Sequence, residues 1–199
     1  MNRLTSRLLG LAATVALALA LAPGTATAQM MDGTRAPVEI DLRGGLYVPT
    51  FDIADAADAG YGFGAGIGIP VGERLTVRGN ADFGFHSGAE VNGVEGPDVD
   101  VNHYIAGLGA VLYRSPDGKF ELSANAGGGI MTFAVDGADE TFTYPAINVG
   151  GTLAYQVAPS VSLLLSPQGD IAFSDEDELG TNNSWVWPFT AGIRITPGR

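Results

Sequence analysis

The chain contains no cysteine, 2 histidines and only 10 lysines and arginines among its 199 residues. Without cysteine, disulfide scaffolds, thiol catalysis and thiolate metal sites are excluded, and two histidines are a small inventory for a metal site. The 22 aspartates and glutamates give a formal net charge of −12, and such an acidic chain repels a phosphate backbone. We therefore expect no cofactor, no metal site and no nucleic-acid partner.

Long hydrophobic runs are scarce as well. The longest, residues 8–22, follows Arg3 and Arg7 and precedes the small residues of Ala26-Thr27-Ala28. A basic start, a short apolar stretch and a small-residue site are typical of a cleaved signal peptide, and this stretch is shorter than the ~20 residues of a spanning helix. We predict a signal peptide at 1–28 and a single domain at 29–199. Within 29–199 no run is long enough for a spanning helix, so a membrane crossing would need strands.

Apolar residues recur at every second position along most of 29–199. Tyr61, Phe63 and Ala65, for example, alternate with glycines, a spacing that a helix would distribute around its whole circumference. This period of two predicts an all-β fold, an eight-stranded antiparallel up-and-down β-barrel of the transmembrane type. The expected strands are 38–49, 61–70, 74–87, 100–114, 119–135, 143–157, 161–173 and 185–195. In 100–114 both phases carry apolar residues, so its register is undecided or it contains a β-bulge.

The connections alternate between short and long. Tight turns with Gly or Pro fall at 71–73, 115–118 and 158–160, and longer loops lie near 50–60, 88–100, 136–142 and 174–184. An up-and-down order would place all the tight turns at one end of the barrel and all the long loops at the other. The long loops hold 14 acidic residues and no lysine or arginine. We expect these acidic loops to face the cell exterior and to associate weakly with divalent cations.

The polar face of the strands carries mostly small residues and a few charges. A soluble barrel would present many long charged side chains to water, whereas a narrow lumen has room only for small residues and paired charges. We predict a polar network in the lumen formed by Glu39, Asp41, Arg43, Arg74, Arg78, Asp82, Glu121, Asp170 and Arg194. The glycines of 62–68 would leave space for arginine and tyrosine side chains across the lumen.

Aromatic residues concentrate on the apolar face, toward the long loops. Membrane barrels place aromatic girdles at the water interface. We predict that the interface aromatics are Tyr61, Phe63, Phe83, Phe85, Trp185, Trp187 and Phe189.

These features together resemble the small outer-membrane β-barrel family, which includes the OmpA membrane domain and OmpX. The resemblance covers about 35–199 and rests on the signal sequence, the eight strands, the alternating turns and loops and the arginine–acid face. It implies a monomer embedded in outer-membrane lipid, without enzymatic activity, whose lumen is filled by side chains. The implied role is structural, or a surface interaction through the acidic loops.

Two alternatives remain open. The same alternation would fit a soluble periplasmic or secreted barrel with an aromatic-lined cavity for an apolar ligand. A lipid-modifying outer-membrane enzyme would need a His and Ser pair, and His86 and Ser87 supply those residue types. Neighbouring strand residues point to opposite faces, so we expect a structural polar contact at His86, and we expect His103 at the rim of a strand.

Overall fold

The computed structural model describes residues 37–91, 93–138 and 141–197. The signal peptide predicted at 1–28 lies outside the described residues. Among the described residues, no helix is long and apolar enough to cross a membrane.

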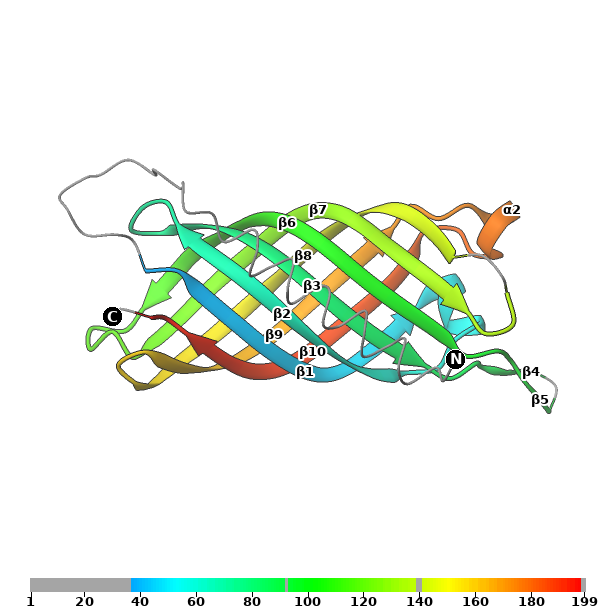
Figure 1. The fold of residues 1–199 in the computed structure, drawn as a ribbon, viewed down its shortest axis with the longest axis horizontal. Coiled ribbons are helices and arrows are strands. Elements are labelled where there is room, and N and C mark those ends of the chain that lie inside the picture. The colour runs from blue at the N-terminus through cyan, green and yellow to red at the C-terminus, as the bar shows by residue number, and fades with distance from the viewer. Residues whose placement is uncertain (1–36, 92, 139–140, 198–199) are drawn as a thin grey trace. The chain divides into compact units, whose positions relative to one another are not determined.

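Eight strands form a closed antiparallel barrel in the order β1-β10-β9-β8-β7-β6-β3-β2 (Figure 1). This confirms the predicted fold class. The barrel strands are β1 (Glu39–Thr50), β2 (Gly60–Pro70), β3 (Leu75–His86), β6 (Val99–Arg114), β7 (Phe120–Val135), β8 (Thr141–Ala158), β9 (Val161–Ala172) and β10 (Ser184–Ile195). Pairing of the first strand with the last closes the barrel, with Ile40 opposite Ile195 and Thr50 opposite Trp185. Closure leaves the barrel sheet without an exposed edge.

The register of β6 explains why its sequence pattern changes phase. Val111 lies opposite Ser123, but Tyr113 lies opposite Leu122, so Leu112 is the extra residue of a β-bulge. A bulge reverses the alternation beyond it. The inward-facing side chains of β6 are therefore the odd-numbered ones before the bulge.

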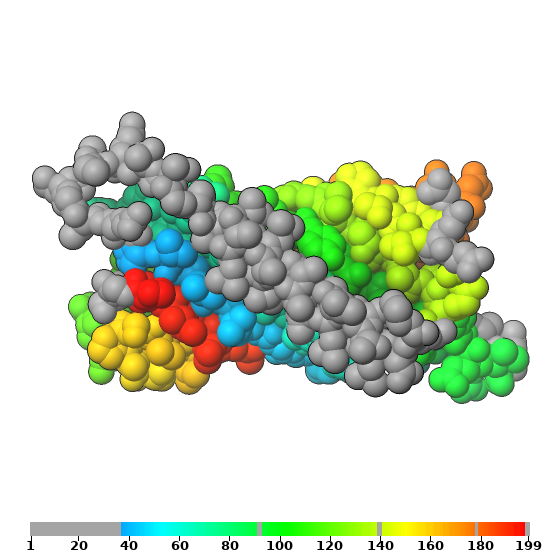
Figure 2. Space-filling view, viewed as in Figure 1, coloured from blue at the N-terminus to red at the C-terminus, as the bar shows by residue number. Residues whose placement is uncertain are grey.

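The two ends of the barrel differ in the length of their connections. The turn end carries the tight β2–β3, β6–β7 and β8–β9 turns. The loop end carries four small elements: the 3-10 helix η1 (Phe51–Asp55), the hairpin of β4 (Glu90–Val91) and β5 (Val94–Glu95), and the short helix α2 (Glu176–Leu179). The β4–β5 hairpin projects beyond the neighbouring strand ends (Figures 1 and 2).

The barrel wall has an apolar outer face and a mixed interior. Leu46 is 60% exposed, whereas its neighbour Tyr47 is completely buried. The same contrast separates exposed Leu42 from buried Asp41 and Arg43. Successive side chains of a strand point to opposite faces, so the hydrophobic side of the alternation lies outside the barrel.

Candidate functional site in the barrel interior

The turn-end half of the interior contains a bidentate ion pair between β1 and β3. The Nε of Arg43 donates to Asp82 Oδ1 at 2.9 Å, and its Nη2 donates to Oδ2 at 2.6 Å. Tyr47 donates its hydroxyl proton to Asp82 Oδ1 at 3.2 Å. Paired charge-assisted hydrogen bonds of this kind fix both distance and orientation.

These two strands are not neighbours, because β2 lies between them. Gly64 is opposite Arg43 on one side and opposite Asp82 on the other. A Cβ at Gly64 would collide with the Asp82 carboxylate. Glycine at this position therefore lets the ion pair pass over the inner surface of β2.

A second group of charges shares Asp41. Arg194 donates from Nε to Asp41 Oδ1 at 2.7 Å and from Nη2 to Oδ2 at 2.9 Å. Arg78 donates to Asp41 Oδ2 at 2.9 Å and to Glu39 Oε2 at 2.5 Å. Arg194 Nη1 also lies 3.2 Å from Glu39 Oε2 and 3.8 Å from Glu121 Oε1. Side chains from β1, β3, β7 and β10 thus meet in one network.

Seven of the predicted lumen residues lie in these two groups, namely Glu39, Asp41, Arg43, Arg78, Asp82, Glu121 and Arg194. Arg114, which is not among the predicted lumen residues, joins through Glu121 with hydrogen bonds of 2.6 and 3.1 Å. It belongs to the inward phase only beyond the β6 bulge, so its placement required knowing where that bulge lies.

The prediction that Arg74 belongs to the lumen network is wrong. It shares the alternation phase of Arg78, but it precedes the first residue of β3 and is exposed in the β2–β3 turn. The alternation of residues tells which face of a strand a side chain belongs to, but it does not tell at which residue the strand begins. Its side chain therefore lies outside the interior network.

Asp170, the remaining predicted residue, is buried with a different partner. Its Oδ2 lies 2.7 Å from His103 Nδ1, and its Oδ1 accepts a hydrogen bond from Asn148. His103 is completely buried and contacts the Tyr47 ring edge-on at a centroid distance of 5.9 Å. The expectation that His103 lies at a strand rim is wrong, because His103 points inward from within β6, between the buried Val101 and Ile105.

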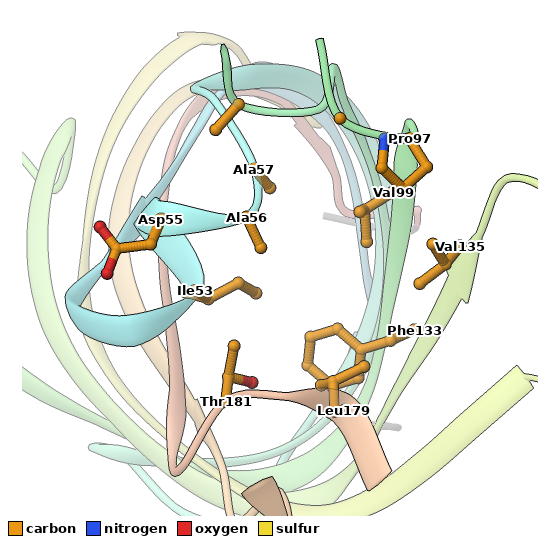
Figure 3. Close-up of a pocket in the computed structure, with 12 residues that line it drawn as sticks. Ile53, Asp55, Ala56, Ala57, Pro97, Val99, Phe133, Val135, Leu179 and Thr181 are labelled. Carbon is orange, nitrogen blue, oxygen red and sulfur yellow. The ribbon is translucent and has the colours of Figure 1, made fainter. Parts of the chain in front are cut away.

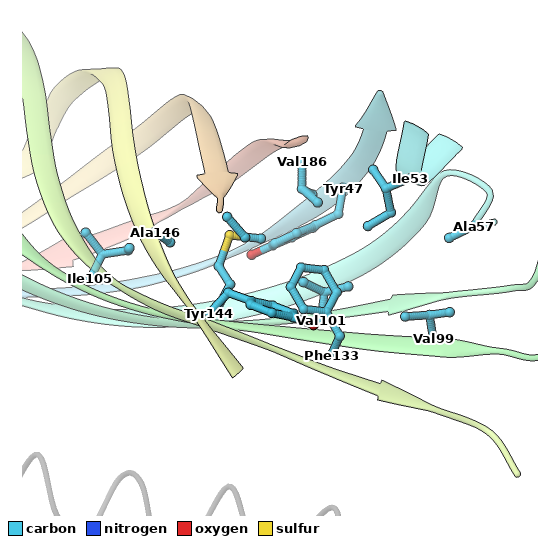
Figure 4. Close-up of a cluster of buried hydrophobic side chains, with 12 residues drawn as sticks. Tyr47, Ile53, Ala57, Val99, Val101, Ile105, Phe133, Tyr144, Ala146 and Val186 are labelled. Carbon is cyan, nitrogen blue, oxygen red and sulfur yellow. The ribbon is translucent and has the colours of Figure 1, made fainter. Parts of the chain in front are cut away.

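Toward the loop end the interior contains a buried apolar cluster (Figure 4). The cluster comprises Tyr47, Ile53, Ala57, Val99, Val101, Ile105, Met131, Phe133, Tyr144, Ala146, Ala172 and Val186. This cluster was not predicted, because the alternation pattern places only polar side chains in the interior. The available signal was β6, where Val99, Val101 and Ile105 alternate with a second partly apolar face.

A cavity of about 340 Å³ adjoins this cluster, beneath the loops (Figure 3). Its walls come from η1, the β3–β6 connection, the ends of β6 and β7, the helix α2 and Thr181. In Figure 3 the side chains of Ile53, Ala56, Val99 and Phe133 surround the hollow, whereas the Asp55 carboxylate points away from it.

The predicted interface aromatics lie on the outer face. Tyr61, Phe63, Phe83 and Phe85 form a contiguous group on β2 and β3, with ring centroids 5.5–5.8 Å apart. On β10, Trp185 and Trp187 stack at 6.2 Å, and Phe189 is 50% exposed. All seven belong to the outward phase of their strands.

The candidate enzymatic pair does not form a nucleophile and base. The Nδ1 of His86 lies 2.9 Å from the main-chain carbonyl of Asp58, which can only accept a hydrogen bond. His86 is buried, whereas the next residue, Ser87, is exposed. Among the described residues, no group of three or more histidine, aspartate or glutamate side chains is placed to hold a metal ion.

The barrel is similar in fold to solved bacterial outer-membrane proteins. Neisserial surface protein A aligns with a TM-score of 0.62 and 14% identity, covering 80% of this chain and 96% of that protein. The outer membrane protein OprG from Pseudomonas aeruginosa aligns with a TM-score of 0.54 and 14% identity, covering 82% and 97%. The N-terminal β-barrel domain of Pseudomonas aeruginosa OprF gives 0.50 and 13%, covering 81% and 97%. No family model and no curated protein matches the sequence. The chain therefore has the fold of the small outer-membrane β-barrels.

Proposed function

We propose that this chain is an outer-membrane β-barrel with a structural or surface-interaction role, with no catalytic activity and little solute conduction. The observation that carries the proposal is that the apolar side chains of the strands point outward and the charged ones point inward. Large apolar side chains such as Leu108, Leu165 and Phe189 are at least half exposed, while Arg43, Arg78 and Arg194 are buried. Water-soluble monomers rarely expose apolar surface on this scale, whereas lipid requires it.

The interior chemistry supports the low conductance. Bidentate pairs such as Arg43 with Asp82 and Arg194 with Asp41 are buried inside the barrel. An eight-stranded barrel has an interior just wide enough for such side chains. Moving an ion past them would require breaking buried ion pairs, which is costly.

The test is membrane fractionation combined with heat-modifiable gel mobility. We expect the full chain to sediment with outer membranes and to migrate faster before boiling than after. In planar bilayers the folded protein should leave the conductance at the level of protein-free lipid. Recovery in the soluble fraction without detergent would overturn the membrane proposal, and a steady open channel would overturn the closed lumen.

A soluble carrier of an apolar ligand is the second candidate, and the cavity of about 340 Å³ is the observation that favours it. The outer face argues against it, because its exposed aliphatic and aromatic residues would have to be covered in water. The fractionation experiment separates the two, since a carrier would stay soluble.

A further inference from the structure

We propose that the loop-end cavity binds a small amphiphile that has an apolar body and a cationic head. The body would enter the cavity between η1, the β3–β6 connection and α2, and the head would stay at the solvent-exposed rim. The proposal deepens the surface-interaction role proposed above and rests on it in one respect: the loop end must face the cell exterior.

The lining specifies an apolar ligand body. Side chains of Ile53, Ala56, Val99, Phe133 and Leu179 contribute hydrocarbon to the wall. The volume of about 340 Å³ lies at the lower end of the ~300–1,000 Å³ range of small-molecule sites. It is more than twice the ~150 Å³ of an apolar cavity that holds benzene. A body of two fused rings or a short alkyl chain is therefore the appropriate size.

The walls are organised by main-chain hydrogen bonds between two loops. The amide of Ala89 donates to the Ala56 carbonyl at 3.1 Å, and the amide of Asp58 donates to the Ser87 carbonyl at 2.9 Å. A Cβ at Gly88 would collide with the backbone of Gly96, so glycine permits this close packing. A wall built in this way does not have to be ordered by the ligand, which lowers the cost of binding.

The side chains beneath the cavity favour binding of a ligand over its passage through the barrel. Val101, Met131 and Tyr144 are buried in the cluster that the cavity adjoins, and the His103–Asp170 pair is buried as well. The ion-pair network lies further toward the turn end. A ligand that enters from the loops can bury its apolar body against this cluster, and passage onward would have to displace these buried side chains.

The charge of the rim specifies the head. The four long loops contain no lysine or arginine. Asp55, which is part of the lining, and Asp98, which is next to it, are both exposed. Several like charges around a low-dielectric opening produce a negative potential, which attracts cations and repels anions. Because the Asp55 carboxylate points away from the hollow (Figure 3), the cationic head would meet the acids in solvent at the rim and would not be buried.

The experiment uses the full chain folded into phosphatidylcholine vesicles, with equilibrium dialysis against three naphthalene probes. The probes are 1-naphthylmethylammonium, 1-naphthylmethanol and 1-naphthoate, and protein-free vesicles provide the blank. We expect saturable binding in the order cation, neutral, anion, with the cation about tenfold tighter than the anion at low salt. Raising the salt concentration should reduce that ratio and leave the neutral probe unchanged.

Two variants separate the apolar and the electrostatic contributions. Ala56→Phe should weaken the cation and the neutral probe alike, by about tenfold or more, because the new ring occupies the cavity. The double variant Asp55→Asn, Asp98→Asn should weaken only the cation, by about threefold. Ala158→Phe and Glu73→Gln make comparable changes at the turn end and should leave all three affinities unchanged.

Each outcome decides the proposal. Equal affinity for cation and anion, or binding insensitive to Ala56→Phe, would overturn it, as would the absence of saturable binding by an inserted barrel. Heat-modifiable mobility is measured on the same samples. A barrel that never inserts contradicts the proposed outer-membrane function, whereas an inserted barrel that fails to bind contradicts only the proposal for the cavity.

Discussion

The two halves of the barrel interior are built from the same strands but are stabilised by different forces. On β1, Asp41 and Arg43 enter the ion-pair network of the turn end, and Tyr47 packs into the apolar cluster of the loop end. Near the loop ends of β6 and β7, apolar side chains point inward, namely those of Val99, Val101 and Phe133. The change from charge to hydrocarbon therefore occurs along individual strands.

The different forces at the two ends are consistent with a cavity at the loop end. Ion pairs and hydrogen bonds are directional, and the bidentate pair of Arg43 with Asp82 fixes the separation of β1 and β3 across β2. Apolar packing is not directional, so it can line a hollow as well as fill one. A second space, lined in part by Arg78 and Asn148, has a volume of only about 10 Å³.

The largest expected effect comes from Asp41→Asn at the turn end. Removing this charge leaves Arg78 and Arg194 buried with Glu39 and Glu121 as their remaining acids. Breaking a buried network in this way costs about 3–5 kcal/mol of unfolding free energy. Urea unfolding in phosphatidylcholine vesicles, followed by tryptophan fluorescence, measures the loss.

The matched control for this prediction is Asp98→Asn, which makes the same change at an exposed position of the loop end. We expect it to alter the unfolding free energy by less than about 0.5 kcal/mol. If the two variants were equally stable, the ion-pair network would not distinguish the turn end from the loop end.

The next effect in size tests the apolar half. Phe133→Ala removes a completely buried ring and should cost about 3 kcal/mol, the low end of the range for such truncations because the site adjoins an existing cavity. Phe173→Ala, at a half-exposed position beyond β9, should cost less than about 1 kcal/mol. The same urea titration measures both. A cost at Phe133 no greater than at Phe173 would mean that the apolar cluster contributes little to stability.

The strand pattern could be predicted because its cause is local. Alternation follows from backbone geometry alone, and a charge such as Asp41, Arg78 or Arg194 on the face opposite the hydrocarbon can be assigned to the interior without coordinates. The bounds of the strands differ from the expected ones by at most two residues. Arg74 was misplaced because it precedes the first residue of β3 and is exposed in the β2–β3 turn.

The loop-end interior could not be predicted by the same rule. Val101 and Phe133 are apolar side chains on the inward face, where the rule expects polar ones. The small elements of the loops also have no periodicity. The bridge between Ala57 and Gly88 joins residues from two loops, and its formation depends on the barrel bringing those loops together.

A smaller effect sharpens the comparison by replacing charge with hydrocarbon. In the double variant Arg43→Met, Asp82→Leu, both partners of a buried pair are removed, so neither charge is left alone. The unfolding free energy should change by about 1 kcal/mol, part of which is the lost acceptor of the Tyr47 hydroxyl.

Each single variant, Arg43→Met or Asp82→Leu, should lower the unfolding free energy by about 3–5 kcal/mol because it leaves the other charge buried without its partner. A double-mutant cycle from the four unfolding curves gives the coupling energy. Additive single effects would show that the pair is not energetically linked, and the ionic description of the turn end would then be wrong.

The smallest effect concerns Asp117, an acid of the turn end that lies in solvent outside the barrel strands. The Ser115 hydroxyl donates to Asp117 Oδ1 at 2.5 Å and the Lys119 amide donates to it at 3.1 Å. These hydrogen bonds, that of Ser115 first, hold the pKa of Asp117 below its ordinary value of 3.8. Because the folded pKa is lowered, the carboxylate stabilises the turn above pH 3.8 and loses this contribution as the pH falls through the folded pKa. Ser115→Ala should raise the pKa toward the ordinary value, as measured by NMR titration of the side-chain carboxyl, while leaving the urea midpoint at neutral pH almost unchanged. A large midpoint shift would show that this exposed turn, and not only the buried network, determines the stability of the turn end.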